Sequence, residues 1–373
     1  MSSSAVVVAG PRTGDTRFAP EEAVRYPRLC FIGPMVGRNA GCITHQGEIV
    51  SDLFEQAGYP VISASALTNR YARAGDIVST VIRQRRNIDL LVLQVYGERS
   101  FVVEDAASLI GQRLGLPMVM VAHGGTLPVF MAKFPRWSRR VFSRAQLIVT
   151  PSLFLARTFN QHGFEARVVP NVINLSSYPY RYRRSVSPKF FWMRAFYDYY
   201  NPMMAVRVLE GVRRMMPDAT LTLAGPDAGL EGDVRRQVAE AGLDGCVRFP
   251  GFLDPSAKAR EAGTADIFLN TTKIDNMPVA VLEACAMGLP VIATSVGGIP
   301  DLLTHDDTAL LVPDGDAQAM MDAVYRLCHE PGLAARLSAN GRRLAERSSW
   351  PSVQPLWEAV FQAASRPITR AHL

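Results

Sequence analysis

Residues 275–301 read DNMPVAVLEACAMGLPVIATSVGGIPD, and this stretch decides the fold of the chain. Asp275 is a good N-cap residue and Pro278 suits a first helical turn, so the pattern predicts a short apolar helix. Gly288 is expected to end that helix, and Pro290 to open a buried strand over 291–293. An apolar helix followed at once by an apolar strand is typical of a parallel sheet with helices on its faces.

The same alternation of apolar runs and amphipathic segments extends outward in both directions. Before the middle of the chain it predicts strands at 29–33, 61–64, 90–95, 118–122, 147–150 and 168–169. Helices are expected between them near 45–57 (with Thr44 as its cap), 76–87, 104–115, 136–144 and 152–161. In the second half, strands are expected at 190–193, 221–224, 247–249, 267–269, 291–293 and 310–312.

The alternation is interrupted once, at residues 175–188 (LSSYPYRYRRSVSP), which indicate a linker between domains. We therefore predict a flexible tail over 1–25 and two similar α/β domains, at 26–178 and 179–350. Parallel sheets bind their ligands at the carboxyl ends of the strands, so the expected active site is a cleft between the two domains.

Composition narrows the class of protein. Of the 373 residues, 48% are hydrophobic and 20% charged, as in a globular protein, and no apolar run approaches the ~20 residues of a membrane span. The five cysteines form no CxxC, which favours reduced thiols and a cytoplasmic location. Residues 1–178 carry a net charge of +7, which suggests an anionic partner, but no nucleic-acid-binding motif accompanies it.

Two carboxylates eight residues apart, Asp275 and Glu283, are followed by Gly288-Leu289-Pro290, Gly297-Gly298 and Pro300-Asp301. This arrangement resembles the E-x7-E signature of the retaining glycosyltransferases of family 4, also called group 1. The resemblance implies the GT-B fold, in which two Rossmann-like domains face a cleft. It also implies transfer of a sugar, with retention, from a nucleotide-sugar to an acceptor hydroxyl, in glycan, polysaccharide or glycolipid biosynthesis and without a metal or other cofactor. The acceptor would be a glycan, a lipid-linked molecule or a small molecule.

The resemblance also assigns roles within this stretch. Glu283 would hold the ribose hydroxyls, and Asp275, Asn276, Met277 and Pro278 would meet the donor sugar. Most members have Glu at the first position, so Asp275 departs from the pattern. From the residues alone, Glu283 in an apolar helix either meets hydrogen-bond donors or lies at a solvated helix edge.

A second similar segment is Phe190-Phe191-Trp192-Met193-Arg194, which resembles the phosphate-binding strand of the family. Arg194 would hold the donor diphosphate, because a guanidinium pairs bidentately with phosphate oxygens. The alternative is an Arg194 that only forms a structural ion pair. The lysine usual five residues later is absent; Tyr199 stands there, and Lys273 is a candidate replacement.

The remaining expected site residues end strands or lie in glycine-rich loops. Gly225 resembles the strand-end glycine near the nucleotide, and Phe252 and Leu253 the segment that lines the base pocket. His123 ends the strand 118–122 and would hydrogen-bond the donor sugar, although a purely structural histidine is the alternative. The loop that contains Gly37 and Gly41 would border the diphosphate and the acceptor.

Two further expectations concern surfaces and domain closure. Lys133, Arg136, Arg140 and Arg144 share a helical stripe, which is either a solvated face or a peripheral contact with an anionic membrane. The family resemblance implies that the C-terminal helix, 351–366, completes the first domain. Two rival functions stay open: a catalytically decayed nucleotide-binding or partner subunit, and a nucleotide-sugar epimerase or hydrolase of the same fold.

Overall fold

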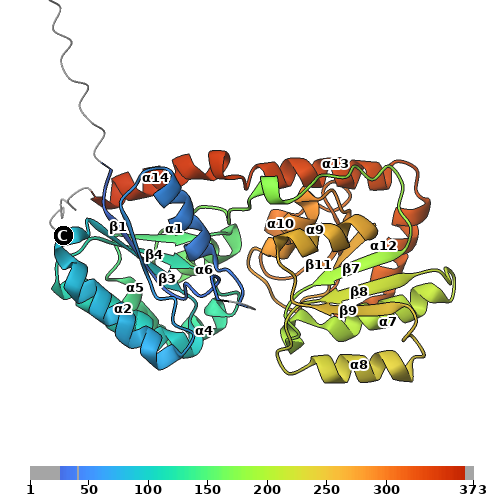
Figure 1. The fold of residues 1–373 in the computed structure, drawn as a ribbon, viewed down its shortest axis with the longest axis horizontal. Coiled ribbons are helices and arrows are strands. Elements are labelled where there is room, and N and C mark those ends of the chain that lie inside the picture. Colours follow the sequence, from blue (N-terminus) through green and yellow to red (C-terminus); the bar gives the residue numbers. More distant parts are fainter. Residues whose placement is uncertain (1–25, 40–41, 366–373) are drawn as a thin grey trace, which may run out of the picture.

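Two parallel six-stranded sheets, each covered by helices, lie side by side in the computed structural model, which describes residues 26–39 and 42–365 (Figure 1). The expected α/β architecture of two similar domains is confirmed. The tail 1–25, Gly41 and residue 366 of the last expected helix lie outside the described residues.

The first domain has the strand order β2-β1-β3-β4-β5-β6. Its elements are β1 (Leu29–Ile32), α1 (Gln46–Gln56), β2 (Val61–Ala64), α2 (Arg70–Gln84), β3 (Leu90–Val95), α3 (Phe101–Arg113), β4 (Met118–Ala122), α4 (Leu127–Lys133), α5 (Pro135–Phe142), β5 (Leu147–Thr150), α6 (Leu153–Gln161) and β6 (Ala166–Val168). Single 3-10 turns at Arg85–Asn87, Glu98–Ser100 and Leu175–Ser177 complete the connections.

The second domain has the order β12-β11-β10-β7-β8-β9. Its elements are β7 (Lys189–Met193), the 3-10 turn η4 (Asp198–Tyr200), α7 (Pro202–Arg213), β8 (Thr220–Ala224), α8 (Glu231–Glu240), β9 (Val247–Gly251), α9 (Pro255–Thr264), β10 (Ile267–Asn270), α10 (Val279–Ala286), β11 (Val291–Thr294), α11 (Ile299–Leu302), β12 (Leu310–Val312), α12 (Ala317–His329) and α13 (Leu333–Glu346).

The central strands of both sheets, such as β3, β4 and β10, are buried on both faces, which explains why they are largely apolar rather than alternating. In the second domain, side chains of α7, α8 and α12 cover one face, and α10 with the C-terminal part of α13 covers the other. In the first domain, α1 lies on one face and α3 on the other. Each sheet therefore has its own core.

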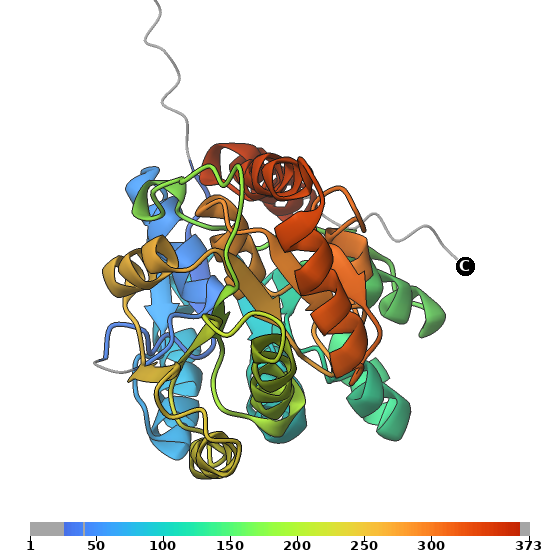
Figure 2. The same cartoon turned by 90° about the vertical axis from the view of Figure 1, so that its right-hand side faces the viewer.

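The last helix, α14 (Trp350–Ser365), leaves the second domain and packs on the first sheet (Figures 1 and 2). Its Val353, Trp357 and Phe361 join the same core cluster as Phe31 of β1. The chain thus crosses between the domains twice. The two crossings run beside each other, since the Ile173 N–H donates to the Ser348 carbonyl at 2.9 Å.

Local differences from the sequence predictions have identifiable causes. α2 begins at Arg70, not near 76, because the Asn69 side chain accepts from two backbone N–H groups and caps it. Phe134 precedes Pro135 and leaves the helical conformation, so the segment around it forms two helices. The cap of α1 is His45 rather than Thr44.

Candidate active site

The candidate active site lies at the carboxyl ends of two strands of the second sheet, β7 and β10. These neighbouring strands lie where the strand order reverses, and loops after such strands form the usual ligand crevice of a parallel sheet. Arg194 follows β7 directly, and the loop 271–278 follows β10. The N-cap of α10 is Pro278, so the prediction of Asp275 at that position is wrong. Asp275 instead turns towards β7.

Arg194 and Asp275 form an ion pair between these two loops. Their side chains are 13% and 14% exposed, so the pair is largely shielded from solvent. Burial opposes the charge of Arg194, yet the Asp275 carboxylate raises the pKa of the guanidinium above its ordinary value. Its Nε is buried and has no hydrogen-bond partner among the described residues. Arg194 therefore keeps donor capacity for a further acceptor.

The glycines of the motif permit close backbone contacts around this pair. A Cβ on Gly225 would lie 1.8 Å from the carbonyl oxygen of Arg194. Similarly, Cβ atoms on Gly297 and Gly298 would lie 2.0 and 1.9 Å from the carbonyl oxygens of Asp275 and Asn276. Any larger residue at these positions would displace the backbone of the site. The glycines thus allow the backbone at Arg194, Asp275 and Asn276 to take its observed position, and donor contact by Gly225 stays a prediction.

Glu283 lies within α10 and is buried, with its side chain 7% exposed. It accepts a hydrogen bond from the Tyr178 hydroxyl at 2.6 Å and pairs with the Lys258 ammonium at 2.8 Å. Burial and the Glu283 carboxylate raise the pKa of Tyr178, which stays a neutral donor. The alternative of Glu283 at a solvated helix edge is therefore wrong, since the carboxylate is inward-facing and paired.

Asn276 and Met277 join the two domains. The Asn276 side chain accepts from the Ser152 hydroxyl and donates to the His123 carbonyl oxygen at 3.0 Å. The Met277 carbonyl oxygen accepts from the Asn171 side chain at 2.9 Å. These contacts bring the end of β4 against the loop 271–278, so residues from both domains meet at one place.

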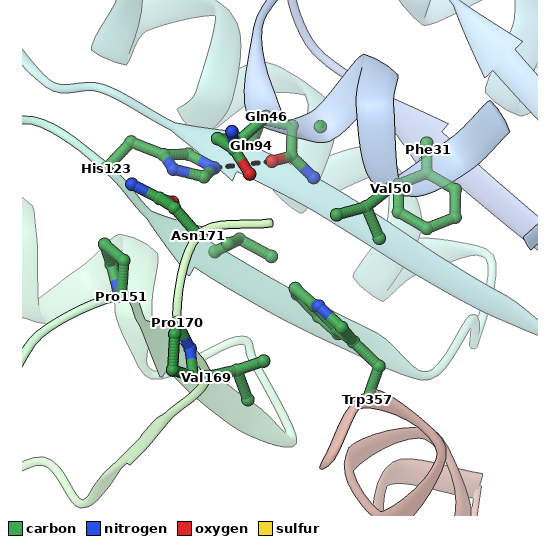
Figure 3. Close-up of a pocket in the computed structure, with 12 residues that line it drawn as sticks. Phe31, Gln46, Val50, Gln94, His123, Pro151, Val169, Pro170, Asn171 and Trp357 are labelled. Atoms are coloured by element: carbon green, nitrogen blue, oxygen red, sulfur yellow. Dashed lines mark hydrogen bonds between the residues drawn. The ribbon is translucent and has the colours of Figure 1, made fainter. Parts of the chain in front are cut away.

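His123 lines a small cavity below this junction, together with Gln94, Asn171 and Trp357 (Figure 3). Its Nε2 lies 2.6 Å from Gln94 Oε1, and its ring stacks on Tyr96 at 5.1 Å. Burial, with a smaller contribution from His45, lowers the pKa of His123 to about 3. Because an amide oxygen can only accept, the neutral imidazole carries its proton on Nε2 and keeps Nδ1 as an acceptor.

The structure does not bring every expected site residue to this junction. The Gly37 N–H donates to Glu48 at 2.8 Å, and the contacts of this loop stay within the first domain. Leu253 is buried with Met277 in the core, whereas Phe252 is exposed. Gly41 is outside the described residues.

The expected stripe of cations is also corrected. Lys133 ends α4, while Arg136 and Arg140 lie on the separate helix α5. Asp105 of α3 pairs with both Arg140 and Arg144, and the Arg144 side chain is only 7% exposed. Arg144 therefore faces the protein, and the stripe is not one continuous face.

Sequence reasoning did not identify Tyr178, Lys258, Asn171 and Ser152 as neighbours of the site. Each lies in a loop or helix whose spatial neighbour is distant in the sequence, so no local spacing could have indicated it. The one Asp-x-Asp of the sequence, Asp314-Gly315-Asp316, lies at a turn. There Asp316 caps α12 by accepting from the Ala319 N–H at 2.8 Å.

A family model described as "Glycosyl transferases group 1" matches residues 187–330, the segment from β7 to α12 that contains Arg194, Asp275 and Glu283. The second domain is therefore similar to the group 1 glycosyltransferases. The chain is 28% identical to the phosphatidyl-myo-inositol mannosyltransferase of Mycobacterium leprae over 67% of this chain and 68% of that protein. It is 36% identical to the amylovoran biosynthesis glycosyltransferase AmsK of Erwinia amylovora over 26% of each chain. The chain thus covers about a quarter to two thirds of these two relatives.

Solved structures match the fold over most of the chain. HepE of Anabaena in complex with UDP-glucose has a TM-score of 0.70 at 16% identity, over 90% of this chain and 100% of HepE. Sucrose-phosphate synthase of Thermosynechococcus elongatus has a TM-score of 0.73 at the same identity and coverage. At such identities the likeness shows the fold, which is GT-B as expected. No helix of residues 26–39 and 42–365 is long and apolar enough to cross a membrane.

Proposed function

We propose that this protein is a retaining glycosyltransferase of family 4 that moves a sugar from a nucleotide-sugar donor to an acceptor hydroxyl. The acceptor is a glycan, a lipid-linked molecule or a small molecule, and the pathway builds a glycan, polysaccharide or glycolipid. Relatives named as mannosyltransferases of phosphatidylinositol and a neighbour solved with UDP-glucose support a nucleoside diphosphate sugar as the donor. No metal is required in this proposal.

The observation that carries the proposal is the state of Arg194. A buried guanidinium with an unpartnered Nε lies at the switch point of the second sheet, beside a carboxylate that pairs with only part of it. Donors left without acceptors in a shielded site are costly unless a ligand completes them. A diphosphate fits, because its oxygens accept several charge-assisted hydrogen bonds from one guanidinium.

The chemistry follows from these groups. The bond between the sugar carbon and the phosphate oxygen breaks, and Arg194 with the first backbone amides of α10 stabilises the charge that develops on the leaving diphosphate. The acceptor oxygen attacks from the same face, and its proton passes to the leaving phosphate. Asp275 and the His123 imidazole accept hydrogen bonds from the sugar hydroxyls. Glu283 accepts hydrogen bonds from the ribose hydroxyls in addition to those from Tyr178 and Lys258.

The direct test is calorimetric titration with UDP, GDP, ADP and TDP, followed by a transfer assay with sugars of the nucleotide that binds. We expect one nucleotide to bind selectively, and Arg194→Ala and Glu283→Gln to weaken it at least tenfold. Matched controls come from elsewhere in the fold. Arg342 also pairs with a carboxylate, and Glu358 also accepts from a tyrosine hydroxyl, so Arg342→Ala and Glu358→Gln should bind normally.

Two results would replace the proposal with a rival. Weak nucleotide binding without turnover of any sugar would favour a decayed binding or partner subunit. Release of free or epimerised sugar without an acceptor would favour a hydrolase or epimerase. Normal transfer by both Arg194→Ala and Glu283→Gln would contradict the site itself.

The proposed location is the cytoplasm, with peripheral contact to an anionic membrane surface. Lys133 and Arg136 remain exposed, and the exposed apolar side chains Val129 and Phe134 lie in the same segment. Cosedimentation with phosphatidylglycerol vesicles, compared with phosphatidylcholine vesicles, tests this contact. The double variant Lys133→Ala, Arg136→Ala should bind both kinds of vesicle equally. Equal binding of the wild type to both kinds would exclude a charge-driven contact.

A further inference from the structure

Three tyrosines gather beside Arg194 in the loop that follows β7. Tyr197 and Tyr199 stack with ring centroids 5.1 Å apart, and Tyr199 and Tyr200 lie 4.5 Å apart. The Arg194 guanidinium lies 4.7 Å from the ring centroid of Tyr200. The loop therefore joins the aromatic cluster directly to the cation that the proposed function assigns to the donor diphosphate.

Backbone contacts fix this loop in place. The Thr271 hydroxyl donates to the carbonyl oxygens of Tyr200 and Asn201, and the Thr272 hydroxyl donates to that of Tyr199, each at 2.9 Å. The Lys273 N–H adds a fourth bond to the Tyr199 carbonyl at 2.8 Å. Residues 271–273 immediately follow β10, so the same two strand ends that position Arg194 and Asp275 also position Tyr199 and Tyr200.

The rings of Tyr199 and Tyr200 lie close together and near the charge of Arg194. The charge of Arg194 acts on both phenols. Burial nevertheless raises the pKa of each phenol above its ordinary value, so both keep their protons. Tyr199 is still 38% exposed, which leaves its face of the cluster accessible to a ligand.

The residues around Arg194 provide too little net positive charge to balance the negative charge of a diphosphate. Asp275 already offsets the charge of Arg194. Lys273, the candidate second cation, instead pairs with Asp198 at 2.8 Å, and that carboxylate is 82% exposed. Both nearby cations are thus matched by carboxylates. A diphosphate at this place needs donors that bring no charge, and phenol hydroxyls are such donors.

We infer that the hydroxyls of Tyr199 and Tyr200 donate hydrogen bonds to the donor diphosphate beside Arg194. These neutral donors take the place of the lysine ammonium that is usual at position 199 in the family. This inference rests on the proposed function, because it concerns the same donor site. Hydrogen bonds from a hydroxyl to a charged phosphate oxygen are short and strong. They also release few counterions, so nucleotide binding depends on one cation and only weakly on salt.

Removing single hydroxyls tests the inference, because Tyr199→Phe and Tyr200→Phe keep the rings that stack on each other and on Arg194. Each variant is titrated with the nucleoside diphosphate that the wild type binds and with the corresponding nucleoside, which lacks phosphates. We expect each variant to lose about fivefold in affinity for the diphosphate and to bind the nucleoside normally. Tyr325→Phe is the control, because Tyr325 stacks on His329 of α12, outside this loop.

The substitution Tyr199→Lys tests the exchange of charge. It should bind the diphosphate at least as tightly as the wild type at low salt, and its affinity should fall more steeply as salt is raised. Diphosphate binding as weak as that of Tyr199→Phe would overturn the exchange of phenol for ammonium.

The results separate this inference from the proposed function. If the wild type binds a nucleoside diphosphate and both phenylalanine variants bind it equally well, the inference is wrong and the donor site stands. Equal losses for diphosphate and nucleoside would mean that the hydroxyls only shape the site, which also overturns the inference. If the wild type binds none of the four nucleoside diphosphates, the proposed function fails first.

Discussion

At the scale of single residues, the Asp275 carboxylate that pairs with Arg194 has opposing effects on donor binding and on sugar transfer. It offsets the cation that would meet the diphosphate, and it accepts from the Asn276 N–H at 2.8 Å at the place proposed for the sugar hydroxyls. Asp275→Asn should therefore bind nucleoside diphosphate more tightly, by about fivefold, while transfer slows ~100-fold. Calorimetry and initial rates on the same preparations check this, and a parallel loss of both would contradict it.

The neutral state of His123 leads to a second prediction at this scale. Burial lowers its pKa to about 3. The folded state then binds fewer protons than the unfolded state between about pH 3 and 6.5, so stability is lost as the pH falls through that window. Transfer rates should show no ionisation of His123 between pH 5.5 and 8, and His123→Gln should give a lower profile of the same shape. A limb near pH 6.5 that disappears in the variant would show a titrating histidine instead.

At the scale of elements, Gly225 shows how a strand end positions a functional side chain. A Cβ there would lie 1.8 Å from the Arg194 carbonyl oxygen, so Gly225→Ala must separate the ends of β7 and β8. We expect a loss of about 3 kcal/mol in the free energy of unfolding and at least tenfold weaker nucleotide binding. Gly232→Ala, in the open surroundings of α8, is the control and should be neutral or slightly stabilising in a urea titration.

Another element prediction concerns the 3-10 turn Glu98–Ser100 before α3. The buried carboxylate of Glu104 accepts from the Tyr96 N–H and the Ser100 hydroxyl, yet burial raises its pKa to about 7. Its protonated form is favoured by folding, so that contribution to stability is present below pH 4.5 and lost as the pH rises to about 7. As the pH rises through this window, the free energy of unfolding of Glu104→Gln should increase relative to that of the wild type by on the order of 3 kcal/mol. A constant difference in melting temperature from pH 4 to 8 would contradict the prediction.

The elements also show how far sequence alone could reach. Apolar runs are bounded by loop residues, so the sequence predicts the strands, and the spacing of Asp275, Glu283 and the glycines indicates the donor site. The sequence does not predict contacts between segments that are distant in the chain. Nothing near Glu283 in the chain indicates Tyr178, 105 residues away, or Lys258 on α9. Likewise, the buried position of Arg144 depends on Asp105, which lies on another helix.

At the scale of the whole molecule, polar contacts hold the two domains together across the site. Besides the bonds of Asn276 and Met277, an ion pair links Arg157 of α6 to Asp301 of α11 at 2.7 Å. The Arg157 side chain is 56% exposed, so the pair contributes about 1 kcal/mol or less and is screened by salt. Because this ion pair is weak, we expect the two domains to separate for substrate entry while the paired crossings at Ile173 and Ser348 stay together.

We predict that Arg157→Ala, which removes this ion pair, shifts the protein without nucleotide towards an open form. Its radius of gyration in small-angle scattering should exceed that of the wild type at low salt. Added salt should expand the wild type and leave the variant nearly unchanged, because the screened contact is already gone. The double variant Arg157→Asp, Asp301→Arg restores an ion pair with exchanged charges and should return the compact form. If the double variant stays as expanded as Arg157→Ala, the attraction between these two charges is not what holds the domains closed.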